Sequence, residues 1–254
     1  MRTAVLILVS LALAATGCGP RKAASVEIDP SLARLVPSDT TMLVDIKIDA
    51  LRGTPLYQKY VARQLTSFKA GADASEVLAV FNGKDGVVFA KEKSGIFRYD
   101  RDGKKTSPTG RSAGVPPVLK EKMRSIPPQN QIWAVGLGSS LPVPDMIPEQ
   151  GNLANLRNLF KALESWTMAA DLRSGLKMEA NAVYKTEQDA KQIHDALRGL
   201  VGLARLSTPN DAPELLRLYD GVQISMEKTS VRVSANIAAD LLDKSLERLE
   251  RGQR

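Results

Sequence analysis

The chain has 254 residues, of which 43% are hydrophobic and 25% charged, and its formal net charge is +7. This length suffices for one large or two small domains with a buried core, and the composition is that of a globular protein rather than a disordered one. The single cysteine and the single histidine exclude an intrachain disulfide and a zinc site made of His and Cys ligands from one chain.

Residues 1–17 have the layout of a secretory signal peptide, with Arg2 ahead of an apolar run and small residues ahead of Cys18. The apolar run, of about a dozen residues, is shorter than the roughly 20 that span a bilayer. The sequence Ala-Thr-Gly-Cys that ends at Cys18 resembles the lipobox of bacterial lipoproteins. The resemblance implies cleavage before Cys18, which then carries a diacylglycerol and an N-acyl chain. No other cofactor is expected.

The same resemblance implies a location in the bacterial cell envelope, facing the periplasm or the exterior. Gly19 stands where an aspartate would follow Cys18, so by analogy with enterobacterial sorting the outer membrane is favoured over the inner. Residues 18–30 show no helical or strand periodicity and predict a tether between lipid and folded body. Such a tether spans about 20 Å as a coil and about 40 Å when stretched. An exported chain is not expected to bind nucleic acid.

Residues 31–125 predict an N-terminal α+β half. The expected elements, in chain order, are a strand at 42–48, an amphipathic helix at 51–65 and a hairpin with strands 76–81 and 86–90. The hairpin turn contains Gly83, which permits the positive φ of a tight turn.

A basic segment follows from Lys91 to Arg124, with ten basic against four acidic side chains. Concentrated positive charge favours anionic partners. Lys104, Lys105 and Arg111 are the candidate contacts with an anionic membrane surface. The alternative is an inert, solvated loop, and the composition of residues 94–114 predicts the least ordered part of the body.

Residues 126–254 predict a C-terminal α+β half. Thr186 and the pair Asp211 and Glu214 have the spacing of helix caps. The expected elements are a strand at 132–137, a helix at 153–163 capped by Asn152, a hairpin with strands 166–172 and 176–184, helices at 187–206 and from 211 through Tyr219, strands at 222–226 and 231–236, and a helix at 238–251.

Both halves show the order strand, helix, strand, strand. The sequence therefore predicts an α+β fold of antiparallel sheets covered by helices, with two βαββ-type halves and a break near residues 108–128. Whether the halves share ancestry or only architecture stays open. The stretches at 35–44, 51–57, 186–191, 196–202 and 216–221 are similar to an uncharacterised lipoprotein family of environmental bacteria such as acidobacteria. That resemblance implies no activity.

No catalytic constellation is visible. His194 lies beside the apolar stripe of helix 187–206 and is interpreted as a boundary residue, and Trp133 and Trp166 as core aromatics that could share one core. No metal site is predicted. The chain is therefore expected to be a binding or structural module of the envelope, with another envelope protein as partner and the membrane reached through its lipid. The alternative is a hydrolase that acts on envelope polymers through two remote carboxylates, which would require two acids in a cleft with pKa values pushed apart.

Overall fold

The computed structural model describes residues 24–62, 73–100, 102–108, 112–138, 160–209 and 211–252. The strands are β1 (Met42–Ile46), β2 (Ala74–Phe81), β3 (Gly86–Glu92), β4 (Gly95–Tyr99), β5 (Lys105–Thr106), β6 (Ile132–Leu137), β7 (Leu163–Asp171), β8 (Gly175–Tyr184), β9 (Val222–Glu227) and β10 (Ser230–Ala238). The helices are α2 (Pro30–Ala33), α3 (Ile48–Arg52), the π-helix η1 (Tyr57–Val61), α5 (Pro117–Met123), α7 (Glu187–Leu206), α8 (Pro213–Asp220) and α9 (Ala239–Gly252).

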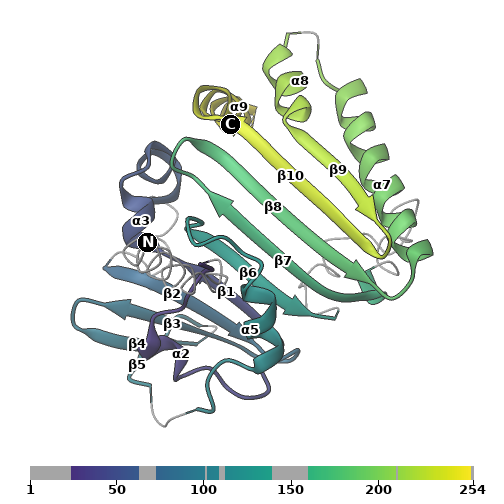
Figure 1. Cartoon of the computed structure of the whole chain (residues 1–254). Coiled ribbons are helices and arrows are strands. Elements are labelled where there is room, and N and C mark those ends of the chain that lie inside the picture. The colour runs from purple at the N-terminus through teal and green to yellow at the C-terminus, as the bar shows by residue number, and fades with distance from the viewer. Residues whose placement is uncertain are drawn as a thin grey trace, which may run out of the picture.

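All the described strands belong to one antiparallel sheet of ten strands (Figure 1). Their order is β5-β4-β3-β2-β1-β6-β7-β8-β10-β9. The α+β class and the antiparallel pairing are therefore confirmed. The break expected near residues 108–128 is wrong, because β1 pairs with β6 and joins the two parts of the sheet, with Val44 opposite Ala134. Both strands are apolar and carry buried residues, so their pairing removes two sheet edges that would otherwise be exposed.

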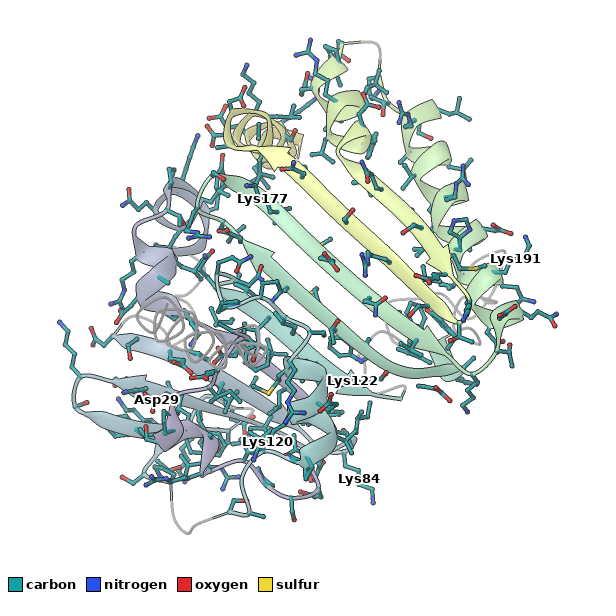
Figure 2. All side chains as sticks on the ribbon, viewed as in Figure 1. Asp29, Lys84, Lys120, Lys122, Lys177 and Lys191 are labelled. Carbon is teal, nitrogen blue, oxygen red and sulfur yellow. The ribbon has the colours of Figure 1, made fainter. Side chains whose placement is uncertain are left out.

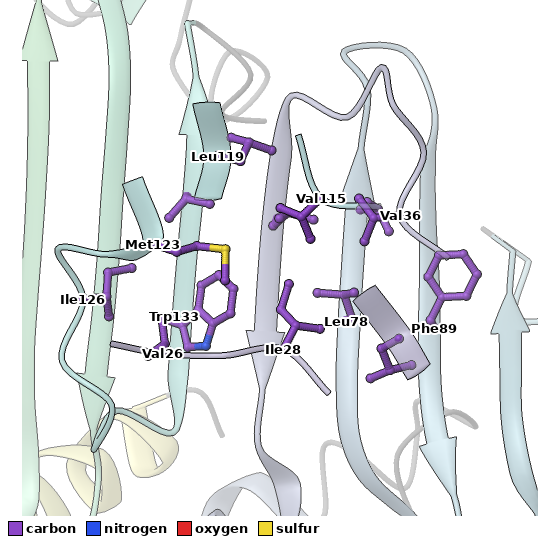
Figure 3. Packing of buried hydrophobic residues seen from close by; sticks show 14 of the residues in the cluster. Val26, Ile28, Val36, Leu78, Phe89, Val115, Leu119, Met123, Ile126 and Trp133 are labelled. Carbon is purple, nitrogen blue, oxygen red and sulfur yellow. The ribbon is translucent and has the colours of Figure 1, made fainter. Parts of the chain in front are cut away.

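Alternate residues of the central strands point to opposite faces of the sheet. The first face carries Leu43 and Trp133 and is covered over β1 to β3 by α2, α5 and the chain around them. Figure 3 shows this core, to which α5 contributes Leu119 and Met123, with Met123 beside Trp133. The second face carries Ala134 and is covered by α7, which buries Ala190 and Ile193, and elsewhere by α3, η1 and α9.

The N-terminal segment is part of the folded body from residue 24 onward. Val26 and Ile28 are buried in the first-face core (Figure 3). The N–H of Val26 donates to the carbonyl of Ile126, and the Nζ of Lys47 donates to the carbonyl of Glu27 at 2.8 Å. The tether predicted for residues 18–30 is therefore wrong over residues 24–30, because two apolar side chains two residues apart make this stretch a packing element. Residues 18–23 lie outside the described residues.

The described parts of the basic segment form strands and a helix joined by turns. It contains the end of β3, then β4, β5 and α5. Tyr99 is buried, and Lys105 lies 3.8 Å from the ring centre of Phe97 and 2.6 Å from the Oε2 of Glu92. Aromatic packing and an ion pair hold this edge of the sheet, although the local composition is polar and basic.

The C-terminal elements follow the sequence closely. Helix α7 has the predicted bounds, and the Oγ1 of Thr186 accepts the N–H of Asp189 at 3.1 Å. The cap predicted at Asp211 is wrong, because α8 begins after Ala212 without a side-chain cap. Asp211 instead accepts a hydrogen bond from Arg248 of α9 at 2.8 Å. The helix predicted at 153–163 and its cap Asn152 fall mostly outside the described residues.

The two tryptophans pack on opposite faces. Trp133 is fully buried on the first face, and Trp166 is buried on the second. They are core residues, as predicted, but they do not share one core. Gly136 lies beneath the Trp166 ring, where a Cβ would come within 2.4 Å of it, so this glycine is required for packing. No helix among the described residues is long and apolar enough to cross a membrane.

Candidate functional site

The first face of the sheet is open over its C-terminal strands. In Figures 1 and 2 no described helix crosses the front of β8, β10 and β9, whereas α2 and α5 cover the neighbouring strands and α5 reaches the edge of β7. The registers place alternate polar side chains on this side of the sheet. We call the following residues the open face: Thr167, Lys177, Glu179, Asn181, Gln223, Ser225, Arg232, Ser234 and Asn236.

A cavity of about 280 Å³ lies where the open face meets the loop after α5. Its wall is formed by residues 125–130 and its floor by side chains of β7, β8 and β10. Hydrogen bonds hold the wall in place: the Nδ2 of Asn130 donates to the carbonyl of Pro127 at 2.9 Å, and the Oε1 of Gln131 accepts the N–H of Leu172 at 2.8 Å. Because these hydrogen bonds already fix the wall, a ligand could bind its polar groups with little further loss of conformational entropy in the protein.

Charges of both signs line the cavity. The guanidinium of Arg173 binds Asp171 through two nitrogens and holds the pKa of that carboxyl far below its usual range. The Nε of Arg232 lies 3.4 Å from Glu179. Lys177 is exposed and has no ion-pair partner in the described part of the chain. This arrangement offers one uncompensated cation, amides and hydroxyls, which bind polar ligands, but no pair of a nucleophile and a base.

A second polar feature is buried beneath the N-terminal segment. Asp45 lies on the first face of β1 with no solvent exposure, and neither carboxyl oxygen has a hydrogen-bond partner among the residues that the structure describes. Burial, with a further contribution from the negative charge of Glu76, raises the pKa of Asp45 to about 8. The carboxyl group is therefore neutral at pH 7. The positive charge of Lys47 lowers the pKa of Asp45, but its effect is smaller than that of burial.

The groups around Asp45 hold the N-terminal segment in place. The Oε1 of Glu76 accepts the backbone N–H of Asp29 at 2.9 Å, and the Nζ of Lys47 lies 3.8 Å from the other oxygen of Glu76. Lys91 binds the carboxylate of Asp29. Burial raises the pKa of Asp29, but Lys91 and Ser31 outweigh it and lower the pKa to about 2. The cluster is structural: it fastens residues 24–29 across the sheet.

Of the residues predicted from the sequence as sites, the structure describes Lys104 and Lys105. Cys18 and Arg111 lie outside the described residues. Lys104 is exposed with no ion-pair partner in the described ranges, whereas the charge of Lys105 is balanced by Glu92. His194 is half-buried on α7 and lies 2.9 Å from Asp195, consistent with a boundary histidine.

The open face and the Asp45 cluster were both missed. Each had a signal in the sequence: the alternation of Lys177, Glu179 and Asn181 in one strand, and a single charge, Asp45, inside an apolar strand. Within the described ranges, no group of three or more His, Cys, Asp or Glu side chains is placed to hold a metal ion.

No protein-family model matches the chain, and no curated protein matches it. Among solved structures, the chain is similar to one described as crystal form I of TP0453, with 10% identity over 88% of this chain and 98% of that one. The TM-score is 0.41, and at this level the likeness carries no argument about function.

Proposed function

We propose that this chain is a lipid-anchored protein of the bacterial cell envelope that uses the open face to bind an extended segment of another envelope protein. The anchor is Cys18, acylated after cleavage of residues 1–17, and the outer membrane is the favoured location. The lipobox-like sequence supports the placement. The observation that carries the binding role is the cavity with a rigid wall at the border of the open face.

The shape and chemistry of the open face favour an extended polar ligand. Its side chains lie in rows along neighbouring strands, with Asn181 beside Arg232 and Glu179 beside Ser234. A solvent-exposed face is common in antiparallel sheets and does not by itself indicate a binding site. The fixed wall and the uncompensated charge of Lys177 are additional features, and they suit a chain that carries backbone amides and at least one carboxylate.

The alternative function, a hydrolase of envelope polymers, is less well supported. It would need two acids in a cleft, one of them held protonated. Asp171 and Glu179 both line the cavity, but Arg173 keeps Asp171 ionised and the guanidinium of Arg232 lies 3.4 Å from Glu179. Asp45 has a raised pKa, but it is fully buried and does not line this cavity. Binding therefore explains the arrangement better than hydrolysis does.

We also propose that the fold consists of two βαββ-type halves. The support is the order of the six central strands, β3-β2-β1-β6-β7-β8, in which β1 to β3 on one side correspond to β6 to β8 on the other. Each set is a first strand followed, later in the chain, by a hairpin. The strands β4, β5, β9 and β10 are then additions at the two edges.

Site-specific photocrosslinking in intact cells tests the binding role. A photoreactive amino acid replaces Asn181 or Asn236 on the open face of the full, lipidated chain, and Val118, exposed on α5, serves as the control position. We expect a discrete crosslinked protein from the open face only. Combining the probe at Asn236 with Lys177→Glu should reduce that product severalfold, because Lys177 supplies the uncompensated charge.

Two results would contradict the proposal: equal crosslinking from Val118, or no discrete product from the open face. The anchor is tested separately. Cys18→Ser should move the protein out of the membrane fraction, and an unchanged mass and fractionation would refute lipidation of that residue.

A further inference from the structure

Helix α7 carries a second apolar stripe that points away from the sheet. Its inward stripe buries Ala190 and Ile193. In its last two turns, Gly199, Gly202, Leu203 and Leu206 recur at the spacing of one helical face. Leu203 is 61% and Leu206 86% exposed, and a Cβ on either glycine would meet no atom within 4 Å. No polar side chain interrupts this outward stripe.

Two further leucines are exposed on α7 and on α8, the helix that packs against it. Leu200 on α7 and Leu216 on α8 are each 39% exposed. We call these four leucines, at positions 200, 203, 206 and 216, the leucine patch. Exposed apolar groups gathered in this way usually mark an interaction surface. In Figure 1, α7 and α8 stand side by side at one end of the molecule.

The charges beside the leucine patch leave an excess of positive charge. The acids of α8 and the preceding turn are paired: Asp220 with Arg205 at 2.5 Å, and Asp211 and Glu214 with Arg248. Arg198 and Arg217, which belong to the same two helices, have no ion-pair partner in the parts of the chain that the structure describes. An anionic partner is therefore favoured.

We propose that the leucine patch docks on an anionic lipid surface, with the leucines among the acyl chains and Arg198 and Arg217 at the headgroups. A lipid surface accepts projecting apolar side chains without needing a complementary pocket, and it rewards arginines at the rim of such a helix. A second copy of the chain fits less well. Four partly exposed leucines offer far less than the roughly 800 Å² that each partner buries in a standard interface. The proposal is independent of the open face and of Cys18.

The chain is well suited to a local test, because Cys18 is its only cysteine. In the full chain carrying Cys18→Ser, Leu206→Cys is labelled with a dye that brightens in apolar surroundings. The matched control is Val118→Cys, since Val118 is also an exposed apolar side chain, at 54%, but lies on α5. Vesicles of phosphatidylcholine with phosphatidylglycerol are compared with vesicles of phosphatidylcholine alone.

We expect the dye at position 206 to brighten and to become protected from an aqueous quencher on the anionic vesicles, and the dye at position 118 to stay in water. A signal peptide that bound vesicles by itself would affect both labelled chains alike. Without a label, Leu203→Ser combined with Leu206→Ser should lower partition into anionic vesicles at least about tenfold, given the transfer free energy of a leucine. Both side chains are exposed, so the circular dichroism spectrum should not change.

Arg198→Glu with Arg217→Glu should remove the preference for anionic over neutral vesicles. Equal signals from positions 206 and 118 would overturn the proposal, and so would partition that ignores the serine substitutions. Brightening at position 206 without vesicles, together with a doubled mass by light scattering, would assign the leucine patch to a second copy and would also overturn it.

Discussion

Replacing Asp45 by asparagine gives a quantitative test of the buried carboxyl group. Folding raises the pKa of Asp45 from 3.8 to about 8, mainly because burial disfavours the carboxylate. Between these two pH values the folded protein holds a proton that the unfolded chain has released. The contribution of Asp45 to the stability of the fold is therefore fully present below pH 3.8 and is lost as the pH rises toward 8.

The magnitude follows from the size of the shift. One proton bound by the folded state alone lowers the free energy of unfolding by about 1.4 kcal/mol per pH unit. Between pH 3.8 and pH 7 this amounts to roughly 4 kcal/mol, as an order of magnitude. Asparagine has nearly the same size and cannot ionise. Asp45→Asn should match the natural chain near pH 4 and should be more stable at pH 7 by up to that amount.

Denaturant unfolding at several pH values between 4 and 8, followed by fluorescence of the buried Trp133 and Trp166, measures the effect. The free energy of unfolding of Asp45→Asn should fall less steeply with pH than that of the natural chain. Asp73→Asn, at an exposed carboxyl, is the matched control and should leave the pH dependence unchanged. A difference in the free energy of unfolding between Asp45→Asn and the natural chain that is the same at every pH would refute the reasoning. It would mean that folding does not change the protonation of Asp45.

Four further substitutions test individual structural features. Gly136→Ala should lower the free energy of unfolding by about 1–3 kcal/mol, because the new Cβ meets the Trp166 ring. Gly199→Ala, on the solvent-exposed side of α7, should raise it by about 0.5–1 kcal/mol. Thermal unfolding measures both variants, and equal effects would contradict the close packing of Trp166 on Gly136. Thr186→Ala should cost about 1 kcal/mol in denaturant unfolding through loss of the α7 cap, and unchanged stability would show that the cap contributes nothing. Arg248→Ala should speed amide hydrogen exchange in α8, which it fastens to α9, and unchanged exchange there would refute that role.

Local patterns predicted the elements whose ends are set by neighbouring residues. Helix α7 begins after its cap Thr186 and ends at Leu206, as its periodicity indicates, and β6 covers the predicted residues 132–137. Both signals lie within a few residues of the element. By contrast, the pairing of β1 with β6 joins segments about 90 residues apart in the sequence. The alternation of polar and apolar residues indicates which side of a strand faces solvent, but it does not indicate which strand pairs with it.

The features that were missed depend on contacts between distant residues. Asp211 and Glu214 have the spacing of a cap, but Arg248 of the last helix binds them both. Strands β4 and β5 are held in place by the buried Tyr99 and by the ion pair between Lys105 and Glu92. The basic composition of the segment does not reveal these contacts. Likewise, the alternation of polar and apolar residues in β8 and β10 could not reveal the open face, because a strand shows the same alternation whether or not a helix covers its polar side.

The packing of residues 24–29 across the sheet has a mechanical consequence for an anchored chain. With Val26 already in the core, only seven residues lie between it and Cys18, a reach of at most about 28 Å. A lipid at Cys18 would therefore hold the body closer to its membrane than a thirteen-residue leash would. Once the stretch before Val26 is extended, any pull on that lipid would load the backbone hydrogen bonds to Lys47 and Glu76 and the buried side chains beside them, so the force would reach the centre of the sheet.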